Sequence, residues 1–578
     1  MKFASFALLA GLVCSSTSIL ACTYDLPEIE LTSGSGGSAG ETASSGNSSS
    51  SGQGGSNACT PGQTGTCNAY NGPPDTQNHG ECKSSTRECL QSASWSACTM
   101  EVDPTPENCK ESLDTNCDQM TGCTGALYRN IDIANTGSNR DDIILAMASK
   151  KGDYGYDGDV YLVGGKNFVN TPLVESSALV LQRNRDGQIN DWSSKFSFMA
   201  TSGSFGVIAT SVAVLPTNGD VVVAGVFFGG TLQIGAKPMM TSATPNTFVA
   251  RFTPSGDVVN AAHLGIGGTL ITKTMVMDTA GKIYIGGEYN GSPQVLSTSL
   301  SATPTQFSDG FVICLSDNLN YAWHQTISGQ GAQKVENLTT MNGTGLVAAI
   351  SVAGDTSFLS TVDTRTFDAG LEPDLVVARL DNTNGKSMWD TRIGASTIVG
   401  SQIIGRLEAG GLAADTSKIV VGAKFAGNID VNNAATYSNA EESTLDSLIV
   451  TLGPDKGALL KHYASQGAGS QEIQDINIDS FGDIVIAGSY SGGFPLDNGK
   501  LGEANVFDGF VAKITPDLQA LWSQQLGTND IQLVRTTHIG KSTGHVFVSG
   551  GFRVDFTLTN PPLMSIGGLD AFFVELAN

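Results

Sequence analysis

The stretch that decides the fold is Asp483-Ile-Val-Ile-Ala-Gly488, followed after a long loop by Asp508-Gly-Phe-Val-Ala-Lys-Ile514 and then by Leu521-Trp522 and Leu526-Gly527. Versions of this pattern recur seven times between residues 124 and 578, about sixty residues apart. Self-similarity at this spacing indicates that one supersecondary unit is repeated along the chain. The architecture therefore follows from the repeat, before any single residue is considered.

Each copy reads as four short strands. The first is an alternating run such as Ile476-Asn-Ile478, and a glycine-containing turn such as Phe481-Gly482 joins it to the second. The second is an apolar run ending in small residues, which is typical of a strand buried on both faces. The third carries the Asp508-Gly-Phe-Val signature, and the fourth carries Trp522. The seven second strands are expected at residues 160–164, 221–225, 283–287, 346–350, 419–423, 484–488 and 546–550.

The seventh copy ends with its third strand, because the chain stops at Asn578. A matching fourth strand stands at the front of the repeat region, where Ala126-Leu-Tyr128 resembles Ala520-Leu-Trp522. A ring closed by a shared sheet removes exposed sheet edges, whereas a linear array needs capping repeats. The sequence therefore predicts an all-β fold: a seven-bladed β-propeller of four-stranded blades, closed by an N-terminal strand and preceded by a small disulfide-rich module.

Large aromatic residues recur in the fourth strand. Trp192, Trp323, Trp389 and Trp522 align there, with Tyr463 in the fifth copy and Tyr128 in the N-terminal strand. The same placement in separate repeats favours packing against the neighbouring repeat over an aromatic ligand cage.

Residues 124–578 resemble the seven-bladed β-propeller repeat family of bacterial exported proteins. The shared features are the Asp-Ala-Phe-Val-Ala-Lys-Leu signature, matched by Asp508-Gly-Phe-Val-Ala-Lys-Ile514, and the following Trp and Leu-Gly steps. The fourth copy departs most, because Gly345-Leu-Val-Ala-Ala349 lacks the end glycine. The family has no common catalytic activity, so the resemblance implies a fold and carries no catalytic residue.

The N-terminus has the features of an export signal. Residues 1–21 combine Lys2 with a short apolar run, which is too short to span a bilayer. The segment Ile19-Leu20-Ala21-Cys22 resembles the lipobox of bacterial lipoproteins, which implies lipidation of Cys22 and membrane attachment through that lipid, with the outer membrane favoured. Ordinary signal cleavage is the alternative. Residues 22–58 are rich in Gly and Ser and are expected to form a flexible linker.

Residues 59–123 form a cysteine-rich module. Eight cysteines in an exported segment with few aliphatic residues predict four disulfides, whose connectivity stays open. The cysteines are Cys59, Cys67, Cys82, Cys89, Cys98, Cys109, Cys117 and Cys123. The layout resembles modules of Gram-negative surface lipoproteins, whose tail is described as a metal-binding motif. Asp114 and Asp118 remain from that motif, but two carboxylates are few for Ca²⁺, so a disulfide-stapled spacer is favoured over a metal site.

Composition and motifs narrow the function. The net charge of −24 disfavours nucleic acid as a partner. The chain contains no Gly-x-Ser-x-Gly, His-Glu-x-x-His or P-loop pattern, so no catalytic or cofactor-binding residue is predicted. We expect a monomeric binding or adhesion scaffold, in the periplasm or on the cell surface, rather than an enzyme. An exported lyase or hydrolase acting in the central channel is the alternative.

Loop lengths point to one face of the predicted propeller. The connections between second and third strands are long and gather at one end of the blades, where variable loops on a rigid scaffold usually bind ligands. A protein or a glycan is the expected ligand. Alignment of the first strands by their turns also predicts a polar column that lines the channel, formed by Ser211, Lys273, Glu336, Gln474 and Thr536.

Overall fold

The computed structural model is built almost entirely of β-strands. The predicted signal, Cys22 and the linker to residue 58 lie outside the residues that it describes. In the described ranges, no helix has the length and apolarity needed to cross a membrane. The described residues are 59–67, 77–102, 104–109, 111–132, 141–151, 157–168, 177–184, 188–201, 205–301, 307–341, 343–359, 364–368, 373–395, 398–399, 402–403, 405–431, 434–439, 444–496, 499–527, 530–540, 543–556, 558, 562–565 and 568–578.

Pairing between neighbouring main strands of the described residues divides them into seven antiparallel groups of four, which we number as blades 1 to 7; β14 links blades 2 and 3, and a short pairing of β24 with β28 links blades 4 and 5. Strand β14 serves twice, as the last strand of blade 2 and the first of blade 3. Blade 1 is β4 (Asp141–Lys151), β5 (Asp157–Phe168), β6 (Ser177–Arg183) and β7 (Ile189–Asp191); blade 2 is β9 (Gly206–Val214), β10 (Val221–Phe228), β13 (Asn246–Phe252) and β14 (Val258–Met277); blade 3 adds β15 (Ile283–Val295), β17 (Asp309–Leu315) and β18 (Tyr321–Gly329). Blade 4 is β19 (Gln333–Met341), β20 (Gly345–Val352), β23 (Asp374–Leu380) and β24 (Ser387–Ala395); blade 5 is β27 (Gly405–Ala414), β28 (Ile419–Val431), β30 (Asp446–Leu452) and β31 (Leu459–Ala464). Blade 6 is β32 (Gln471–Ile478), β33 (Ile484–Gly492), β36 (Ala504–Ile514) and β37 (Ala520–Leu526); blade 7 is β38 (Gln532–Ile539), β39 (Val546–Phe552), β42 (Asp570–Leu576) and β3 (Leu127–Asp132).

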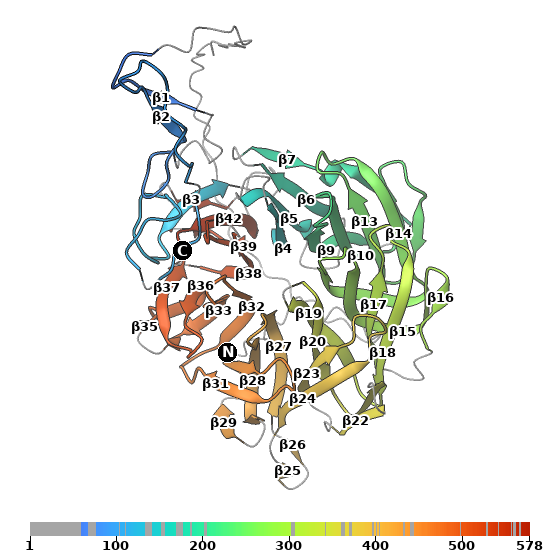
Figure 1. The fold of residues 1–578 in the computed structure, drawn as a ribbon. Helices are drawn as coiled ribbons and strands as arrows, with labels where there is room; N and C mark the ends of the chain where they lie inside the picture. Colours follow the sequence, from blue (N-terminus) through green and yellow to red (C-terminus); the bar gives the residue numbers. More distant parts are fainter. Residues whose placement is uncertain are drawn as a thin grey trace, which may run out of the picture. The chain divides into compact units, whose positions relative to one another are not determined.

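The blades are arranged as a closed ring, with the first strand of each blade facing the centre (Figure 1). Adjacent blades share apolar cores, because their second and third strands are buried on both faces. Val163 of blade 1 packs in one cluster with Val223 of blade 2. Leu162 of blade 1 packs in another with Phe573 of blade 7. The predicted all-β propeller is therefore confirmed, and its core continues across the junction between the last blade and the first.

The closing strand is supplied by the N-terminal segment, as the repeat predicted. Strand β3 pairs antiparallel with β42, and Asn130 stands opposite Val574. The backbone N–H of Ala577 donates to the carbonyl oxygen of Ala126 at 2.8 Å, which extends the pairing beyond the strand. Blade 7 thus joins both ends of the repeat region in one sheet.

Tryptophans pack between neighbouring blades rather than around a ligand. A β-carbon added to Gly256, Gly385 or Gly457 would lie within 2.4–2.6 Å of Trp192, Trp323 or Trp389 of the preceding blade. Each of these glycines has a positive φ and stands two residues before the fourth strand of its own blade. The indole therefore lies against a turn that has no room for a side chain.

The alignment of tyrosines with these tryptophans is wrong. In strand register, Trp323, Trp389 and Trp522 stand opposite Cys314, Arg379 and Lys513. Lys461 and Arg129 occupy the equivalent positions of blades 5 and 7, instead of Tyr463 and Tyr128. Trp192 lies just beyond β7, so it reaches the next blade from a different register position. An aromatic residue alone did not reveal the register, because the equivalent positions of blades 5 and 7 are occupied by a lysine and an arginine.

A bulge in each first strand explains the glycines that end the second strands. Each first strand has an extra residue near the end of the second strand, which no residue of the second strand faces, and β4 and β14 have further register shifts. A β-carbon at the residue opposite the bulge would lie 1.8–2.0 Å from a carbonyl oxygen of the first strand in five blades, at Gly164, Gly225, Gly287, Gly488 and Gly550. Blades 4 and 5 have Ile350 and Ala423 there.

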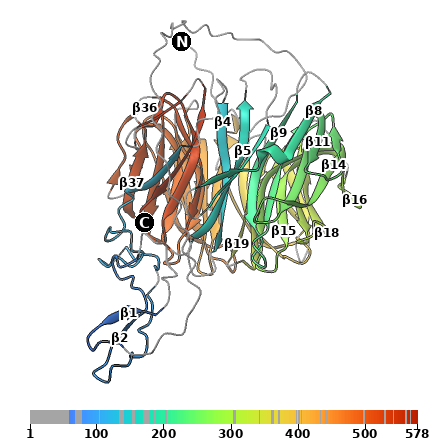
Figure 2. The same cartoon turned by 90° about the horizontal axis from the view of Figure 1, so that it is seen from above.

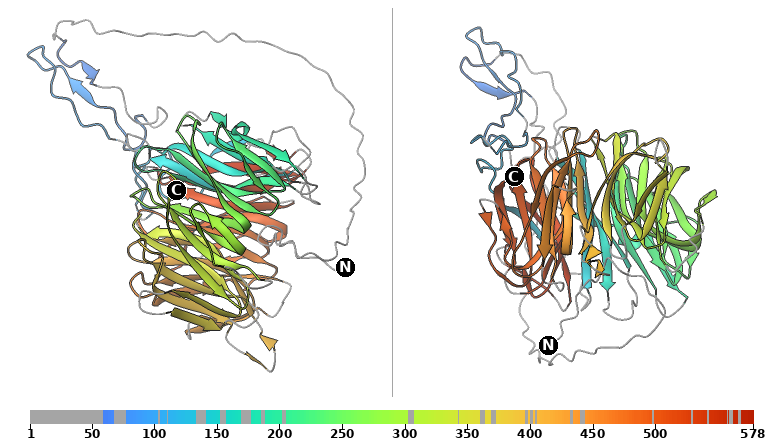
Figure 3. Two further views of the ribbon diagram at one scale, coloured as in Figure 1. Left: turned by 90° about the vertical axis from the view of Figure 1, so that its right-hand side faces the viewer. Right: turned by 90° about the horizontal axis from the view of Figure 1, so that it is seen from below.

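The connections between second and third strands carry additional strands, all at the same end of the blades. Figures 2 and 3 view the ring from the side, with the strands of each blade crossing its thickness. We call this end the hairpin face. Its added strands are β11 (Gly230–Ile234), β12 (Met240–Ser242), β16 (Thr298–Ser299), β21 (Asp355–Leu359), β22 (Thr364–Asp368), β29 (Ala435–Asn439), β34 (Pro495–Leu496), β35 (Gly499–Lys500), β40 (Asp555–Phe556) and β41 (Leu563–Met564), with β8 (Phe196–Ala200), β25 (Ile398–Val399), β26 (Gln402–Ile403) and the short 3-10 helix η1 (Ser193–Lys195) in the connections between blades.

The eight cysteines form four disulfides: Cys59–Cys89, Cys67–Cys98, Cys82–Cys117 and Cys109–Cys123. Disulfides persist in oxidising compartments, so they indicate an exported protein. Of the described residues, Cys59–Gly65 and Arg87–Ala97 form one compact unit, and those within Thr66–Thr86 and Cys98–Asn578 form the second. In the first unit the Arg87 guanidinium lies 4.6 Å from the Trp95 ring centre. Short strands β1 (Thr64–Thr66) and β2 (Thr86–Glu88) fall at the boundaries. Residues 98–123 therefore belong with the propeller.

Candidate functional site

The bulge residues of the first strands replace part of the predicted channel column. Lys273, Glu336 and Gln474 are the extra residues of β14, β19 and β32. Ser211 and Thr536 instead pair with Ala224 and Ser549 and are buried, so their predicted place in the column is wrong. The bulge residues of those two strands are Thr210 and Arg535.

The misplacement has a local cause. Alignment by the turn assumes turns of equal length, but the turns of blades 2 and 7 are one residue longer than those of blades 3 and 6. Val214 faces Val221 and Ile539 faces Val546, whereas Met277 faces Ile283 and Ile478 faces Ile484. In five blades the bulge lies opposite the glycine that ends the second strand. Aligning the repeats by this glycine, instead of by the turn, would have placed the bulge residues in one column.

Four of the bulge residues, Lys273, Glu336, Gln474 and Arg535, belong to a belt of charged and polar side chains. Lys273 Nζ lies 2.8 Å from Glu336 Oε2, a contact that joins blade 3 to blade 4. Lys273 and Lys334 flank Glu288 at 4.0 and 3.9 Å, and Ser308 Oγ donates to Glu288 Oε2 at 2.6 Å.

The belt continues across the next pair of blades. Lys424 of blade 5 lies 3.8 Å from Glu408 and 3.3 Å from Glu472 of blade 6, and Gln474 Nε2 donates to Glu472 Oε2 at 3.1 Å. We call these residues, together with Arg535, the charge belt.

The neighbouring carboxylates favour the charged form of Lys273. Burial alone would lower the pKa of Lys273, but Glu336 and Glu288 outweigh it and raise the pKa. Burial lowers the pKa of Arg535, opposed by Glu472. The Arg535 Nε has no hydrogen-bond acceptor among the described residues. The belt therefore presents acidic and basic side chains together with one incompletely satisfied guanidinium.

The charge belt lies at the hairpin-face end of the blades. Lys334 and Glu336 are near the start of β19, and Glu408, Glu472 and Arg535 are near the starts of β27, β32 and β38. The starts of first strands and the ends of second strands meet at the same end of a blade. The belt is thus next to the connections that carry the added strands.

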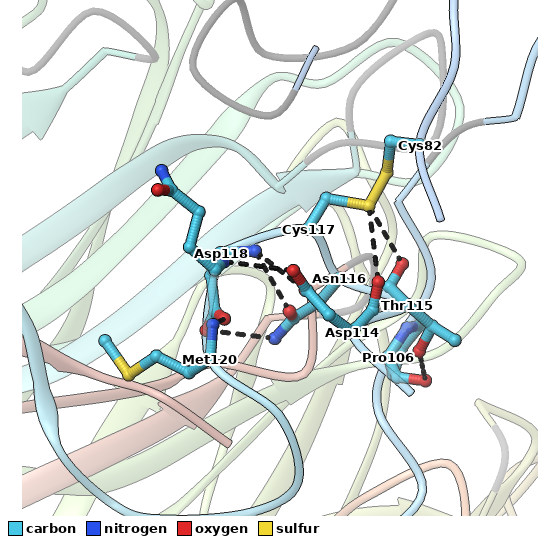
Figure 4. The surroundings of a disulfide bond; sticks show 9 residues. Cys82, Pro106, Asp114, Thr115, Asn116, Cys117, Asp118 and Met120 are labelled. Atoms are coloured by element: carbon cyan, nitrogen blue, oxygen red, sulfur yellow. Dashed lines mark hydrogen bonds between the residues drawn. A yellow bond between two sulfur atoms is a disulfide. The ribbon is translucent and has the colours of Figure 1, made fainter. Parts of the chain in front are cut away.

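A second polar cluster surrounds the sequence candidates Asp114 and Asp118. Carboxylate oxygens of Glu107, Asp114 and Asp118 all lie within 4.8 Å of one another. Figure 4 shows Asp114 and Asp118 beside the disulfide of Cys117. Asp114 accepts backbone N–H bonds from Asp118 at 3.1 Å and Gln119 at 3.2 Å, and Asp118 accepts one from Met120 at 2.8 Å.

His545 ties this cluster to blade 7. Its Nε2 lies 3.0 Å from Asp118 Oδ2, and its Nδ1 lies 2.7 Å from Glu575 Oε1. Burial would lower the pKa of His545, but its hydrogen bonds to the two carboxylates outweigh it and raise the pKa to about 9. Burial, with Asp118 and Asp114 nearby, raises the pKa of Glu107 to about 8. At neutral pH, His545 is therefore charged and Glu107 is protonated.

These contacts make the cluster a clasp between the cysteine-rich segment and the propeller. Ca²⁺ takes six to eight oxygens, and the oxygens of Asp114 and Asp118 already accept hydrogen bonds, so the residues fit a cation poorly. Asn578 extends the clasp, because its Nδ2 donates to the Glu107 carbonyl oxygen at 3.0 Å and its Oδ1 accepts from Lys513 Nζ. We call Glu107, Asp118, His545, Glu575 and Asn578 the polar clasp. Sequence reasoning missed it, because His545 is 427 residues from Asp118.

Comparisons with known proteins give distant likenesses of fold. No family model and no curated protein matches the sequence. Among solved structures, Sqt1 of Chaetomium thermophilum aligns with 73% of this chain and 96% of its own, at 10% identity and a TM-score of 0.34. The quinohemoprotein alcohol dehydrogenase of Comamonas testosteroni aligns with 77% of this chain and 78% of its own, at 12% identity and a TM-score of 0.33. The Cps50 (Swd1) β-propeller domain of Myceliophteria thermophila aligns with 74% and 96%, at 9% identity and a TM-score of 0.27. These TM-scores are too low to support an argument. The identification of the β-propeller therefore rests on the strand pairings of this chain.

Proposed function

We propose that this protein is an exported binding scaffold that holds a protein or glycan ligand at the hairpin face, over the mouth of the channel. The observation that carries the proposal is the charge belt, in which Lys273 and Glu336 join two blades and stand next to long connections. Rigid strands position these side chains, while the connections supply variable contacts. Neighbouring acidic and basic side chains favour a ligand that itself carries charges of both signs.

The belt supports binding better than catalysis. A general base or nucleophile needs a pKa near the working pH, whereas Glu336 and Glu288 raise the pKa of Lys273 away from it. We therefore propose a non-enzymatic role. The alternative function, a lyase or hydrolase that acts in the channel, must be excluded by the binding experiment described below.

Membrane attachment through lipidated Cys22 is the second part of the proposal, with the outer membrane as its location. It rests on the lipobox resemblance of Ile19-Leu20-Ala21-Cys22 and agrees with the four disulfides of an exported chain. A Cys22→Ala variant should move from the membrane fraction to the soluble fraction. Continued fractionation with membranes would refute the anchor.

The binding proposal is tested with charge exchange across the belt. The probes are a glycan array and labelled outer-membrane proteins, offered to the purified chain. Lys273→Glu should reduce binding at least tenfold, and the exchanged pair Lys273→Glu with Glu336→Lys should keep the blades joined but still bind poorly. Lys461→Glu is the control, because Lys461 forms an exposed pair with Asp517 away from the belt. Binding that survives both belt variants, or turnover of a bound glycan, would refute the proposal.

A further inference from the structure

A groove of about 530 Å³ lies on the rim of the propeller, where the outer strand of blade 2 meets blade 3. Its walls are Asn260–His263 of β14, the turn Leu296–Ser297 after β15, and Asn318–Asn320 with Tyr321, the first residue of β18. We call it the rim groove. None of the charge-belt residues lines this groove, and on β14 its wall is formed by Asn260–His263 rather than by Lys273. The two sites are therefore separate.

The lining of the rim groove is polar but uncharged. Its side chains are three asparagines, a serine, a tyrosine, a histidine and aliphatic residues. Burial lowers the pKa of His263 to about 4, so its imidazole is neutral at pH 7. His263 Nε2 lies 2.8 Å from Asn246 Oδ1, and its ring packs 5.0 Å from Phe227. The chain as a whole has a net charge of −24, yet no charged side chain lines this groove. The groove therefore does not favour an ionic ligand.

The amides of the rim groove are held in place from behind. Arg251 Nη1 donates to Asn318 Oδ1 at 3.0 Å, and Arg251 Nε lies 2.8 Å from Asp220 Oδ2. Asn260 Nδ2 donates to the Asn318 carbonyl oxygen at 2.9 Å. Because the Asn318 oxygen is engaged by a nearly buried guanidinium, its Nδ2 is the group left to donate to a ligand. Asn320 stands beside it with an exposed side chain.

An aromatic and aliphatic wall completes the groove. Tyr321 is held by a 2.9 Å hydrogen bond between its hydroxyl and His324 Nδ1. Leu296 has a φ of 53°, which is uncommon for leucine, and it also lines the groove. Planar amides that donate and accept, next to the face of a tyrosine, match the hydroxyls and the apolar ring face of a sugar.

We propose that the rim groove binds a neutral saccharide, which Asn318 and Asn320 hydrogen-bond and Tyr321 stacks upon. An anionic ligand fits less well, because Arg251 is already paired with Asp220. A cation fits less well, because no carboxylate lines the groove within the described residues. The volume lies within the range of about 300–1,000 Å³ that is usual for small-ligand sites.

The test is binding of neutral oligosaccharides on an array by the purified full chain, followed by titration with the best ligand. Asn320→Ala should weaken binding about tenfold, which corresponds to one hydrogen bond. Gln519→Ala is the matched control, because Gln519 occupies the same turn position in blade 6 that Asn320 occupies in blade 3. Each of the two residues follows a leucine with a positive φ and directly precedes the fourth strand of its blade. Tyr321→Phe should keep stacking and most of the affinity, whereas Tyr321→Ala should lose it. Because Tyr321 also packs against the core of blades 2 and 3, the affinities are compared at a temperature at which circular dichroism shows that both variants are folded.

The outcomes separate this site from the charge belt. Saccharide binding that is lost in Asn320→Ala but kept in Lys273→Glu supports the rim groove, whatever the fate of the proposed ligand at the channel mouth. Binding that is unchanged in Asn320→Ala and Tyr321→Ala overturns the inference. The inference also fails if no neutral saccharide binds, or if an extended peptide displaces the saccharide by pairing with the edge of β14.

Discussion

Trp522 of blade 6 packs directly on Gly125, two residues before the closing strand β3, so that a β-carbon on Gly125 would lie 2.4 Å from the indole. Trp192, Trp323 and Trp389 pack in the same way on Gly256, Gly385 and Gly457 of the following blades. The N-terminal segment therefore reproduces the inter-blade contact that ordinary repeats make. This contact identifies β3 as an integral part of the ring.

We predict that Gly125→Ala destabilises the propeller by more than about 2 kcal/mol, because the methyl group collides with Trp522 and Gly125 has a φ of 64°. Chemical denaturation gives the free energy of unfolding. Gly453→Ala is the control, because its β-carbon would meet no atom closer than 3.6 Å. Equal effects of the two substitutions would contradict this packing.

Gly488→Ala should destabilise blade 6 by a similar amount. Its β-carbon would lie 1.9 Å from the Glu472 carbonyl oxygen, so the bulge that presents Gln474 to the channel must shift. Denaturation and amide exchange of β32 and β33 measure the effect. A variant as stable as wild type would show that the bulge does not require glycine there.

The polar clasp should make stability fall as the pH rises. The folded-state pKa of His545 is raised from 6.5 to about 9, so its contribution is complete below pH 6.5 and is lost as the pH rises through 9. The pKa of Glu107 is raised from 4.5 to about 8 in the folded state. Between these two pH values Glu107 keeps its proton only when the protein is folded, so the free energy of unfolding also falls as the pH rises through this interval. Each group contributes a slope of up to about 1.4 kcal/mol per pH unit.

Melting temperatures between pH 5 and pH 9 test this prediction. Glu107→Gln should flatten the decline below pH 8, and His545→Gln should flatten it above pH 6.5 at a cost in stability at pH 6. A melting temperature that rises over this range in the wild-type chain would contradict the clasp.

The Cys109–Cys123 disulfide should brace the closing strand. Its partners are 14 residues apart, and removing such a cross-link costs about 3 kcal/mol. Replacing both cysteines with serine should therefore lower the melting temperature of the propeller. The matched control replaces Cys59 and Cys89, whose disulfide lies in the other compact unit. If the control lowers the propeller transition as much, the bracing role is wrong.

The repeat made the fold predictable from the sequence. Second strands such as Ile484–Gly488 and the borrowed strand at Ala126–Tyr128 follow from local pattern, because apolar runs and turn glycines recur. The role of Gly125 could also have been predicted from the sequence, because Gly385 and Gly457 likewise stand two residues before the fourth strands of their blades.

The sites were less predictable. One extra residue in a turn moved Ser211 and Thr536 out of the channel column, because a single-residue slip changes the face of a strand. The His545–Asp118 contact joins residues that no local pattern links. The rim groove likewise assembles Asn260 and Asn318 from two blades.

The central claim is that the N-terminal segment closes the ring, and amide hydrogen exchange of β42 tests it most directly. The comparison is between the chain from residue 59 and the same chain without residues 59–132, which lacks β3 and the polar clasp partners Glu107 and Asp118. We predict that β42 loses protection in the shortened chain and that the free energy of unfolding falls by several kcal/mol, because an inner strand becomes an edge. Unchanged protection of β42 with unchanged stability would contradict the claim.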